Sequence, residues 1–258
     1  MVIFAIGDIC ADSGITFLRQ KLPSLRKLYD VDLVIANGEN SAANGVGITS
    51  SSAESIFTSG VDIITTGNHA FASNGYENLF DNTYGLLRPY NLGKGVPGVG
   101  SMIYDKGRYQ ILIVNLIGIS YMNISGTNFY DAMDELLKEA TTNIIIVDFH
   151  AEYTSEKVAF ARNFDGKISL VFGTHTHVQT ADDTIFPEGT AYITDLGMTG
   201  TKESIIGVDI LKAIQKQRYA TPTRLAPAKG PAFLCGVLAE IDDSTGKAKA
   251  IRRIQIEE

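Results

Sequence analysis

The sequence predicts an α/β protein in which β-sheet structure is sandwiched between layers of helices. Short runs rich in β-branched residues alternate with longer amphipathic segments along almost the whole chain, which is the pattern of a layered α/β fold. Most of these runs are continuously apolar, as expected for strands that are buried on both faces. The chain has 258 residues, of which 45% are hydrophobic and 20% charged, so we expect one domain, residues 1–258, with a sizeable core.

The expected strands are short apolar segments separated by polar turns. In chain order they cover residues 2–6, 31–36, 61–66, 110–116, 143–149, 169–173 and 191–194. The last two apolar segments, residues 232–242 and 251–258, flank the turn sequence DDSTGK and therefore predict a terminal β-hairpin.

The expected helices lie between these strands, over residues 13–29, 50–59, 130–140 and 152–162. In the first helix, apolar residues recur at three- and four-residue spacing and predict one core-facing stripe, formed by Ile15, Leu18, Leu22, Leu25 and Leu28. Residues 92–100 and 196–231, which are rich in glycine or proline, are expected to be surface loops. The first of these loops lacks the residue pattern of a Walker phosphate-binding loop.

The composition excludes several classes of protein. The formal charge is −7 and the lysines and arginines are scattered, so a broad nucleic-acid-binding surface is not expected. Two cysteines, Cys10 and Cys235, form neither a disulfide framework nor a zinc knuckle, which fits a reducing cytosol. The chain begins directly with an apolar strand, and its longest apolar stretch, residues 112–122, is too short to span a bilayer. We therefore expect a cytoplasmic protein without a membrane partner.

Unusual polar residues follow the carboxyl ends of five expected strands. That edge is where open α/β sheets bind their ligands. All four histidines of the chain belong to this set, which would not be expected if they served only packing or solubility. The residues are Asp8, Glu39, Asn40, Asn68, His69, His150, His175 and His177.

The chemistry that needs such a set is metal binding. Imidazole nitrogens together with carboxylate oxygens suit divalent Zn, Mn, Fe or Co. Residues two apart in an extended segment point to the same side, so His175 and His177 are expected to face one site.

Six of these residues are candidate metal ligands: Asp8, Glu39, Asn68, His150, His175 and His177. They exceed the needs of one catalytic ion and suit two ions roughly 3.5–4 Å apart. Two divalent ions with Asp8, Glu39 and a bridging hydroxide leave one net positive charge, which would attract a phosphate group.

The blocks GD at 7–8, NGEN at 37–40, GNH at 67–69, His150 and GTHTH at 173–177 resemble, in order and spacing, the calcineurin-like metallophosphoesterases. The longer strings NGENSAANGVGIT, DFHAEYTSEK, GTHTHVQTAD and AYITDLGMTG resemble the bacterial YmdB-like branch of that superfamily. The resemblance covers nearly the whole chain. It implies a layered metallophosphoesterase sandwich with central mixed β-sheets, and a two-metal phosphodiesterase acting on cyclic nucleotides, either 2′,3′- or 3′,5′-cyclic.

The resemblance also implies a role for each matched residue. Asp8, Glu39 and His177 would bind one ion, while Asn68, His150 and His175 would bind the second, with Glu39 bridging. His69 would act as general acid or charge stabiliser at the scissile phosphate, and Asn40 would be a further site residue. Iron or manganese is favoured as the metal, with zinc as the other choice.

The sequence departs from the wider superfamily at three positions. Cys10 stands where the first block usually carries histidine, and a small buried cysteine is favoured there over a metal ligand. Ala70 follows His69 in place of the acid that usually orients this histidine. Glu39 replaces the usual bridging aspartate, as it does in the YmdB-like branch.

The functional hypothesis is hydrolysis of phosphodiesters by a metal-bridging hydroxide. Two alternatives stay open: a regulatory protein that binds a nucleotide or an RNA end with weak turnover, and a phosphomonoesterase or protein phosphatase using the same site. Association of the chain with copies of itself is also open. Asp148 either orients His150 or simply ends a strand, and Asp195 is expected to be structural. Tyr121, Tyr130 and Tyr153 either pack or stack on a base.

Overall fold

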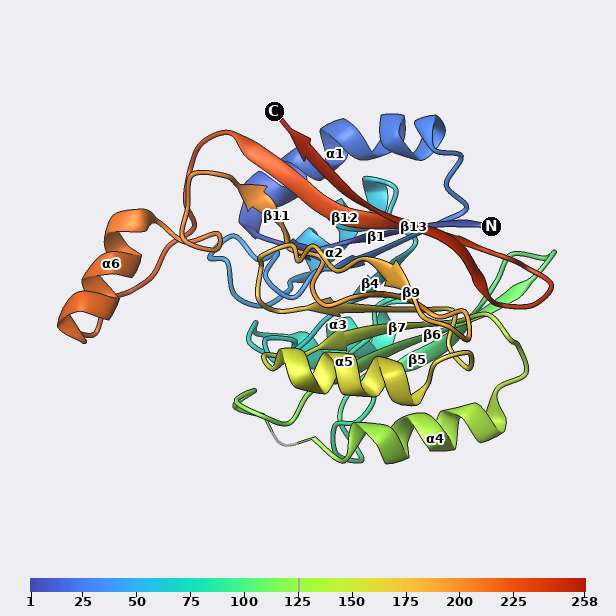
Figure 1. The fold of residues 1–258 in the computed structure, drawn as a ribbon. Coiled ribbons are helices and arrows are strands. Elements are labelled where there is room, and N and C mark those ends of the chain that lie inside the picture. Colours follow the sequence, from blue (N-terminus) through green and yellow to red (C-terminus); the bar gives the residue numbers. More distant parts are fainter. Residues whose placement is uncertain (125) are drawn as a thin grey trace.

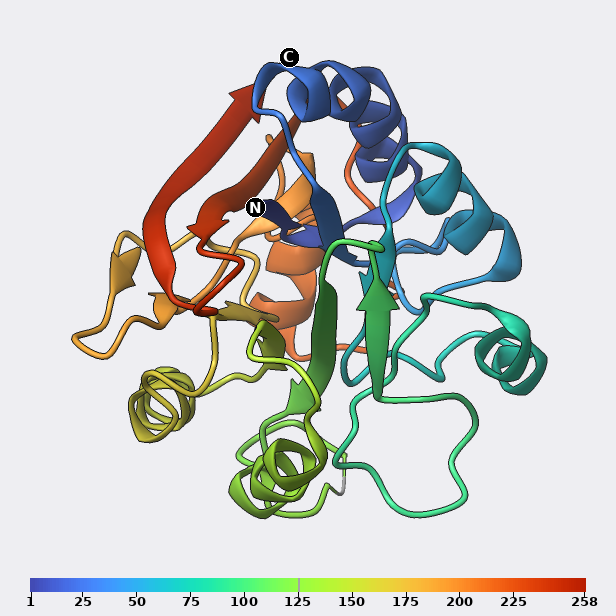
Figure 2. The ribbon, with the colours of Figure 1, turned by 90° about the vertical axis from the view of Figure 1, so that its right-hand side faces the viewer.

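Two β-sheets lie face to face between two layers of helices (Figure 1). The computed structural model describes residues 1–124 and 126–258. The end-on view in Figure 2 shows the helices outside the two sheets. The expected α/β sandwich with central mixed sheets is confirmed.

The first sheet has seven strands, and its members come from both ends of the chain. They are β1 (Val2–Ile6), β2 (Asp8–Ile9), β3 (Leu33–Asn37), β4 (Ile63–Thr65), β11 (Met198–Thr201), β12 (Ala232–Ile241) and β13 (Ala248–Glu257). The expected terminal hairpin is confirmed, because β12 and β13 pair antiparallel along their length.

The second sheet has six strands and is built from the middle of the chain. Its strands are β5 (Ser101–Asp105), β6 (Gln110–Ile117), β7 (Ile145–His150), β8 (Leu170–Thr174), β9 (Thr184–Ile185) and β10 (Ala191–Ile193). The helices are α1 (Ala11–Leu28), α2 (Ser50–Thr58), α3 (Tyr76–Asn82), α4 (Phe129–Glu139), α5 (Thr154–Asn163) and α6 (Ile210–Tyr219).

Each sheet has a hydrophobic core on both of its faces, which explains why its strands are apolar without alternation. In β1, Ile3 and Ala5 point into the core between the two sheets, whereas Phe4 and Ile6 point into the core beneath α1 and α2. Because successive strand residues face opposite sides, a strand buried on both faces must be apolar at every position. The second sheet repeats this arrangement, with α4 and α5 over its outer face.

The apolar stripe predicted for α1 is confirmed except at its last member. Ile15, Leu18, Leu22 and Leu25 are buried against the first sheet, but Leu28 is 69% exposed. The helix ends at Leu28, beyond the edge of the core, so the prediction for this residue was wrong.

The expectation of a surface loop over residues 196–231 was also wrong in part. This segment contains β11 and α6. Strand β11 has the sequence MTGT, which has no apolar run, and its extended form depends on pairing with β2 and β12. Helix α6 buries only Ala213, so it lacks the stripe by which helices are found in a sequence.

Strand β12 connects the two ends of the chain. One of its edges pairs first with β11, through Thr199 and Leu234, and then with β1, through Ile6 and Gly236. The short strand β2 is parallel to β11, with Met198 opposite Asp8. The strand that carries Asp8 is therefore held in the sheet through the C-terminal part of the chain.

Among the helices of the described residues, none combines the length and the apolarity that crossing a membrane requires.

Candidate metal centre

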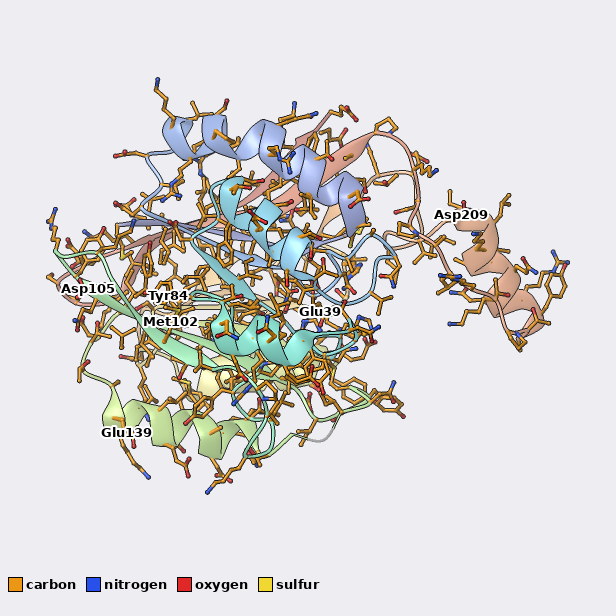
Figure 3. All side chains as sticks on the ribbon, turned by 180° about the vertical axis from the view of Figure 1, so that it is seen from behind. Glu39, Tyr84, Met102, Asp105, Glu139 and Asp209 are labelled. Atoms are coloured by element: carbon orange, nitrogen blue, oxygen red, sulfur yellow. The ribbon has the colours of Figure 1, made fainter. Side chains whose placement is uncertain are left out.

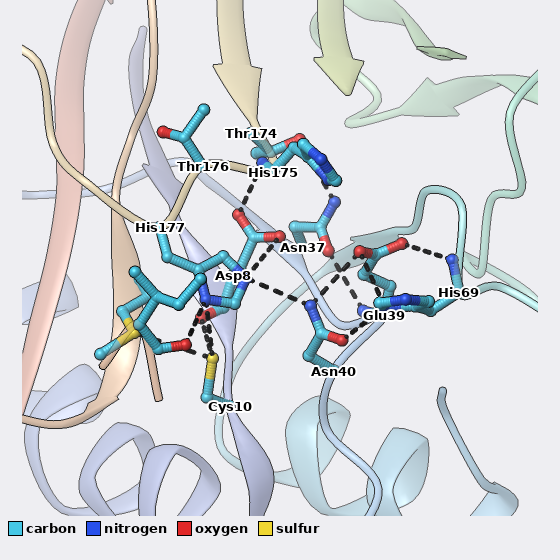
Figure 4. Close-up of polar contacts among 12 residues, drawn as sticks. Asp8, Cys10, Asn37, Glu39, Asn40, His69, Thr174, His175, Thr176 and His177 are labelled. Carbon is cyan, nitrogen blue, oxygen red and sulfur yellow. Dashed lines mark hydrogen bonds and ion pairs between the residues drawn. The ribbon is translucent and has the colours of Figure 1, made fainter. Parts of the chain in front are cut away.

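The polar residues expected at the strand ends converge on one place. Figure 4 shows Asp8, Glu39, Asn40, His69, His175 and His177 around a common centre. Asp8 lies in β2, and the pair Glu39 and Asn40 follows β3. Residues 68–69 follow β4, His150 ends β7, and residues 175–177 follow β8. Both sheets thus contribute, which places the centre where their carboxyl-terminal edges meet.

His150 is surrounded by three other candidate ligands, Glu39, Asn68 and His175, which together form one half of the centre. Its Nε2 atom lies 3.2 Å from Glu39 Oε1, 2.9 Å from Asn68 Oδ1 and 3.0 Å from His175 Nδ1. The donor atoms of Glu39, His150 and His175 all lie within 4.8 Å of one another. One nitrogen cannot donate a single proton to three neighbours at once. A cation between these four groups would satisfy all of them.

The other nitrogen of His150 fixes its tautomer. Thr174 Oγ1 donates a hydrogen bond to Asp148 Oδ1 at 2.7 Å, so it accepts from His150 Nδ1, which lies 2.9 Å away. In the neutral ring the proton is therefore on Nδ1, and the lone pair of Nε2 points at the other ligand candidates. Asp148 thus orients His150 through Thr174 rather than by direct contact. Such partners of a metal-binding histidine raise its affinity for the ion.

Asp8 and His177 form the other half of the centre. Asp8 is fully buried, its Oδ1 atom is 3.7 Å from His177 Nε2, and this oxygen has no hydrogen-bond partner among the described residues. His177 donates from Nδ1 to the carbonyl oxygen of Ile206 at 2.9 Å, and its Nε2, which lies 3.2 Å from Asn40 Nδ2, faces Asp8. A buried carboxylate oxygen without a partner is costly, by about 1–3 kcal/mol. Its position beside the His177 Nε2 atom fits a divalent cation.

Cys10 lies behind His177 and not in front of it. Its Sγ atom is 3.7 Å from His177 Nδ1, the nitrogen that faces away from Asp8, and it donates to the carbonyl oxygen of Asp8 at 3.5 Å. The contact agrees with a buried packing cysteine, the interpretation favoured at this position.

His69 has a partner that the sequence did not reveal. Its Nδ1 atom is 2.9 Å from Asn40 Oδ1 and 3.6 Å from Glu39 Oε1, and its backbone N–H donates to Glu39 Oε2 at 3.0 Å. The amide of Asn40 takes the place of the acid that is missing at Ala70. The side chain of His69 is 39% exposed, so its other nitrogen is accessible to a ligand.

The electrostatics of the centre favour a cation. Burial raises the pKa of Asp8 to about 6, against the opposing effect of His177. Burial also acts to raise the pKa of Glu39, but the charges and hydrogen bonds of His150 and His69 together outweigh it and lower that pKa to about 2. Burial and the charge of His150 lower the pKa of His175 to about 3. Glu39 is therefore ionised and His175 neutral at neutral pH, the forms that bind metal.

A proton competes with the cation at His150. Burial acts to lower the pKa of His150, but the negative charge of Glu39 and Asp8 raises it above its ordinary value. Because a metal ion needs the unprotonated imidazole, metal binding at this position would release that proton.

A buried ion pair fixes the segment that carries His175 and His177. Lys157 Nζ donates to the carbonyl oxygen of Thr174 at 2.9 Å and to Asp195 Oδ2 at 2.8 Å, and Asp195 Oδ2 accepts from the N–H of Thr176 at 3.1 Å. Asp195 was expected to be structural, and Lys157 was missed because its partners lie far away in the sequence. Together they hold both ends of the His175 peptide.

The reason given for the shared direction of the two histidines was wrong. Strand β8 ends at Thr174, and His175 and His177 have φ values of 103° and 65°, outside the extended region. They face one centre because the backbone turns there, not because a strand alternates. Positive φ is strained for residues other than glycine, so the contacts of Lys157 and Asp195 are needed to maintain it.

A glycine lets the second sheet approach the loop after β4. A Cβ atom on Gly67 would lie 2.2 Å from His150 Cδ2, so no larger residue fits between β4 and His150. This close approach brings Asn68 against His150.

A cavity of about 550 Å³ opens in front of the centre. Glu39, Asn40, His69, His175 and His177 line its floor, and residues of the segment around α6, including Lys216 and Leu225, line its wall. Glu152, which was not expected, also lines it and places Oε2 3.1 Å from His175 Nε2. The volume suits a ligand the size of a nucleotide.

Comparisons with known proteins bear on this arrangement. The family model described as "YmdB-like protein" matches residues 4–254. A 2′,3′-cyclic-nucleotide 2′-phosphodiesterase of Bacillus subtilis is 42% identical, over 99% of this chain and 97% of the relative. The crystal structure of a novel phosphatase from Mycoplasma pneumoniae superposes with a TM-score of 0.95 at 35% identity, over 100% of this chain and 93% of that one.

A more distant structure shares the fold. The calcineurin-like phosphoesterase YfkN from Bacillus subtilis has a TM-score of 0.61 at 10% identity, over 100% of this chain and 90% of that chain. The sandwich of two sheets and flanking helices is thus the fold of the calcineurin-like phosphoesterases.

Proposed function

The chain belongs to the YmdB-like family, and we propose that it hydrolyses cyclic nucleotides or other small phosphodiesters with the help of two divalent cations. It is a hydrolase of the metallophosphoesterase type, in keeping with the phosphodiesterase and phosphatase named among its relatives. Of the two cyclic substrates expected from the sequence, the name of the Bacillus relative supports the 2′,3′-cyclic one.

The proposal depends on two buried atoms at the centre, one without a hydrogen-bond partner and one with more neighbours than a single proton can serve. Asp8 Oδ1 is buried without a hydrogen-bond partner among the described residues, and His150 Nε2 faces three groups at once. We propose that Asp8, Glu39 and His177 hold one ion and that Asn68, His150 and His175 hold the other, with Glu39 shared. Iron or manganese is favoured and zinc is the other candidate. Bound divalent cations supply Lewis-acid stabilisation of the charge on the phosphoryl oxygens.

The residues of the chain supply the remaining functions. Asn40 Oδ1 accepts from His69 Nδ1, so the ring is oriented with Nε2 toward the cavity. We propose that the doubly protonated ring gives the proton on this nitrogen to the leaving oxygen, or stabilises its charge, while the proton on Nδ1 stays bonded to Asn40. Glu152 holds His175 from the cavity side, and the cavity wall near Val208 and Leu225 shields the substrate from bulk water.

The decisive experiment is a substrate panel after chelation. The protein is stripped with a chelator and reloaded with Mn, Fe or Zn separately, and 2′,3′-cyclic AMP, 3′,5′-cyclic AMP, an aryl diester and an aryl monoester are assayed in parallel. We expect diesters to be preferred and about two ions per chain at full activity. Activity that survives complete removal of metal would reject the metal role. A monoester preference would favour a phosphomonoesterase, and tight binding without turnover would favour a regulatory protein.

Substitution His69→Ala tests the general acid. An alkoxide leaving group needs a proton, whereas nitrophenolate leaves without one. We therefore expect His69→Ala to lower kcat on a cyclic nucleotide by about 10²–10⁴-fold and on a nitrophenyl diester by far less. Asn40→Ala should lower kcat on the two substrates in the same order but to a smaller degree, because Asn40 orients the His69 ring without taking part in proton transfer. Equal losses on both substrates would show that His69 does not protonate the leaving group.

The two ends of the chain are close together in the structure. We propose that residues 1–258 act as one domain, since Val2 of β1 lies opposite Glu240 of β12 and the two ends of the chain thereby share a sheet. The cytoplasmic location expected from the sequence stays a prediction.

A further inference from the structure

Ile206 has a backbone conformation that its residue type rarely adopts. Ile205 and Val208 exchange two backbone hydrogen bonds, of 2.9 and 3.0 Å. The two residues between them, Ile206 and Gly207, have φ values of 47° and 94°. Positive φ at both central residues is the arrangement of a type I′ turn, in which asparagine followed by glycine is the preferred pair. Because positive φ is strained for a β-branched residue, the turn itself does not select isoleucine.

The metal centre explains the turn but not the isoleucine side chain. The carbonyl oxygen of Ile206 accepts from His177 Nδ1 at 2.9 Å, so the turn helps to hold a candidate ligand. Asparagine or glycine would supply the same carbonyl oxygen with less strain. Ile206 is 51% exposed, and the hydrophobic cores formed by the described residues do not include it. Strain retained next to a metal centre, without a packing role, indicates a functional contact.

The exposed side chain of Ile206 lines the cavity in front of the metal centre. Val46 and Leu225, which are 42% and 36% exposed, line the same cavity. Five apolar residues together form what is here called the apolar wall: Val46, Ile206, Val208, Leu225 and Pro227. Exposed apolar side chains gathered in one cavity mark a binding site for an apolar group.

The apolar wall is held together by contacts between separate segments of the chain. Residues 205–209 and 226–228 are joined by two backbone hydrogen bonds, each 2.9 Å long. A Cβ atom on Gly45 would lie 3.2 Å from a ring carbon of the proline in the second segment, so the loop after β3 packs directly against it. In Figure 3, Asp209 at the start of α6 and Glu39 at the metal centre lie toward the same end of the molecule. The wall is thus a fixed part of the cavity.

A nucleotide has the same division into a charged and an apolar part. Its phosphate suits the polar floor of the cavity, and the flat faces of its base suit an apolar wall. Asn44 also lines the cavity, and its Oδ1 atom accepts from the N–H of Val46 at 3.0 Å, which leaves Nδ2 as the donor of the amide. The ring nitrogens and carbonyl oxygens at the edge of a base are acceptors for such a donor, whereas an alkyl group has none.

We propose that the nucleobase of the substrate packs on the apolar wall, in contact with the side chain of Ile206. This inference rests on the proposed function, the hydrolysis of small phosphodiesters at the metal centre. The contact gives cyclic nucleotides an advantage over cyclic phosphodiesters that have no base. Ile206 is then a specificity-determining residue, since it binds the base and takes no part in the chemistry.

Substitution Ile206→Asn removes the apolar contact and keeps the turn, because asparagine is the preferred residue at this position. The value of kcat/KM is measured on 2′,3′-cyclic AMP and on glycerol 1,2-cyclic phosphate, which has the same five-membered cyclic diester but no base. We expect the ratio of the first value to the second to fall by about tenfold. Val46→Ala, on another segment of the wall, should lower the same ratio to a smaller degree.

The matched control is Ile119→Asn. Ile119 is the same residue type and is 50% exposed, but it lies outside the cavity. This variant should keep the substrate ratio of the wild type.

Two further measurements do not depend on turnover. The affinity for adenosine 3′-monophosphate relative to that for inorganic phosphate, measured by calorimetry, should fall by about tenfold in Ile206→Asn. The midpoint of urea unfolding should not fall, because the substitution relieves the strain of positive φ. A side chain retained for packing would give the opposite change in the midpoint.

An unchanged substrate ratio in Ile206→Asn would overturn the base site and leave the metal centre untouched. Loss of both kcat/KM values by the same factor, with a lower urea midpoint, is the result expected of a packing residue and would also overturn it. If the metal-loaded wild type hydrolyses neither cyclic substrate, the proposed function fails. The two affinities then decide the base site separately, and equal binding of the nucleotide and of inorganic phosphate would reject it.

Discussion

Substitution Glu39→Gln is expected to lower kcat/KM on a phosphodiester by at least about a thousandfold. Glu39 is buried and ionised, with Oε1 3.2 Å from His150 Nε2, and in the proposed function it is shared between the two ions. The amide of glutamine has nearly the same shape but lacks the charge that two neighbouring cations require. The number of ions per chain, measured by elemental analysis, should fall from about two.

A matched substitution separates this effect from a general loss of charge. Glu54→Gln changes an exposed glutamate on α2 and should leave both the activity and the metal content unchanged. Full activity of Glu39→Gln in buffer replete with metal would remove Glu39 from the catalytic centre.

Lys157→Met is expected to lower the free energy of unfolding by about 3–5 kcal/mol. Lys157 and Asp195 are 1% and 0% exposed and form an ion pair of 2.8 Å, so removal of the lysine leaves a buried carboxylate without its counter-charge. The peptide around His175, held from both sides by this pair, should also lose its fixed geometry. Urea unfolding measures the first effect, and the metal dissociation constant measures the second.

The double variant Lys157→Met with Asp195→Asn distinguishes charge from packing. It restores electroneutrality and retains a side-chain oxygen at residue 195 to accept from the N–H of Thr176, so it should recover much of the lost stability. If the double variant is no more stable than Lys157→Met, the loss comes from packing and the ion-pair explanation is wrong.

The strands and the residues at their ends were predictable from local sequence. Buried strands such as β1, β3 and β7 are apolar over most of their length, and a polar residue at or directly after the end of such a run has few reasons to be there. Parallel strands bring their carboxyl ends to one edge of a sheet, which explains why Asp8 and Glu39 meet. His150 ends a strand of the other sheet, and it joins them because the two sheets pack with these edges together.

The residues that support the centre were not predictable. Their partners are remote in the sequence, or no local sequence pattern distinguishes them. Lys157 meets Asp195 across 38 positions, and Asn40 reaches His69 across 29. The turn that aims His175 and His177 is a backbone conformation that neither residue type favours, so it follows from the surrounding contacts. Helix α6 was missed because a helix that leaves the core has no core-facing stripe.

The arrangement of β2, β11 and β12 has a consequence for the order in which the protein can be made. The strand of Asp8 pairs with β11, which in turn pairs with β12 at Leu234. Both partner strands come near the end of the sequence, so Asp8 leaves the ribosome long before they do. The N–H of Gly7 also donates to the carbonyl oxygen of Cys235 at 3.0 Å. The first candidate metal ligand of the chain therefore cannot be locked in place until β12 has been synthesised. A nascent chain that ends before β12 would carry every candidate ligand in its sequence but lack the strand that fixes Asp8, so we expect metal loading to follow the synthesis of β12.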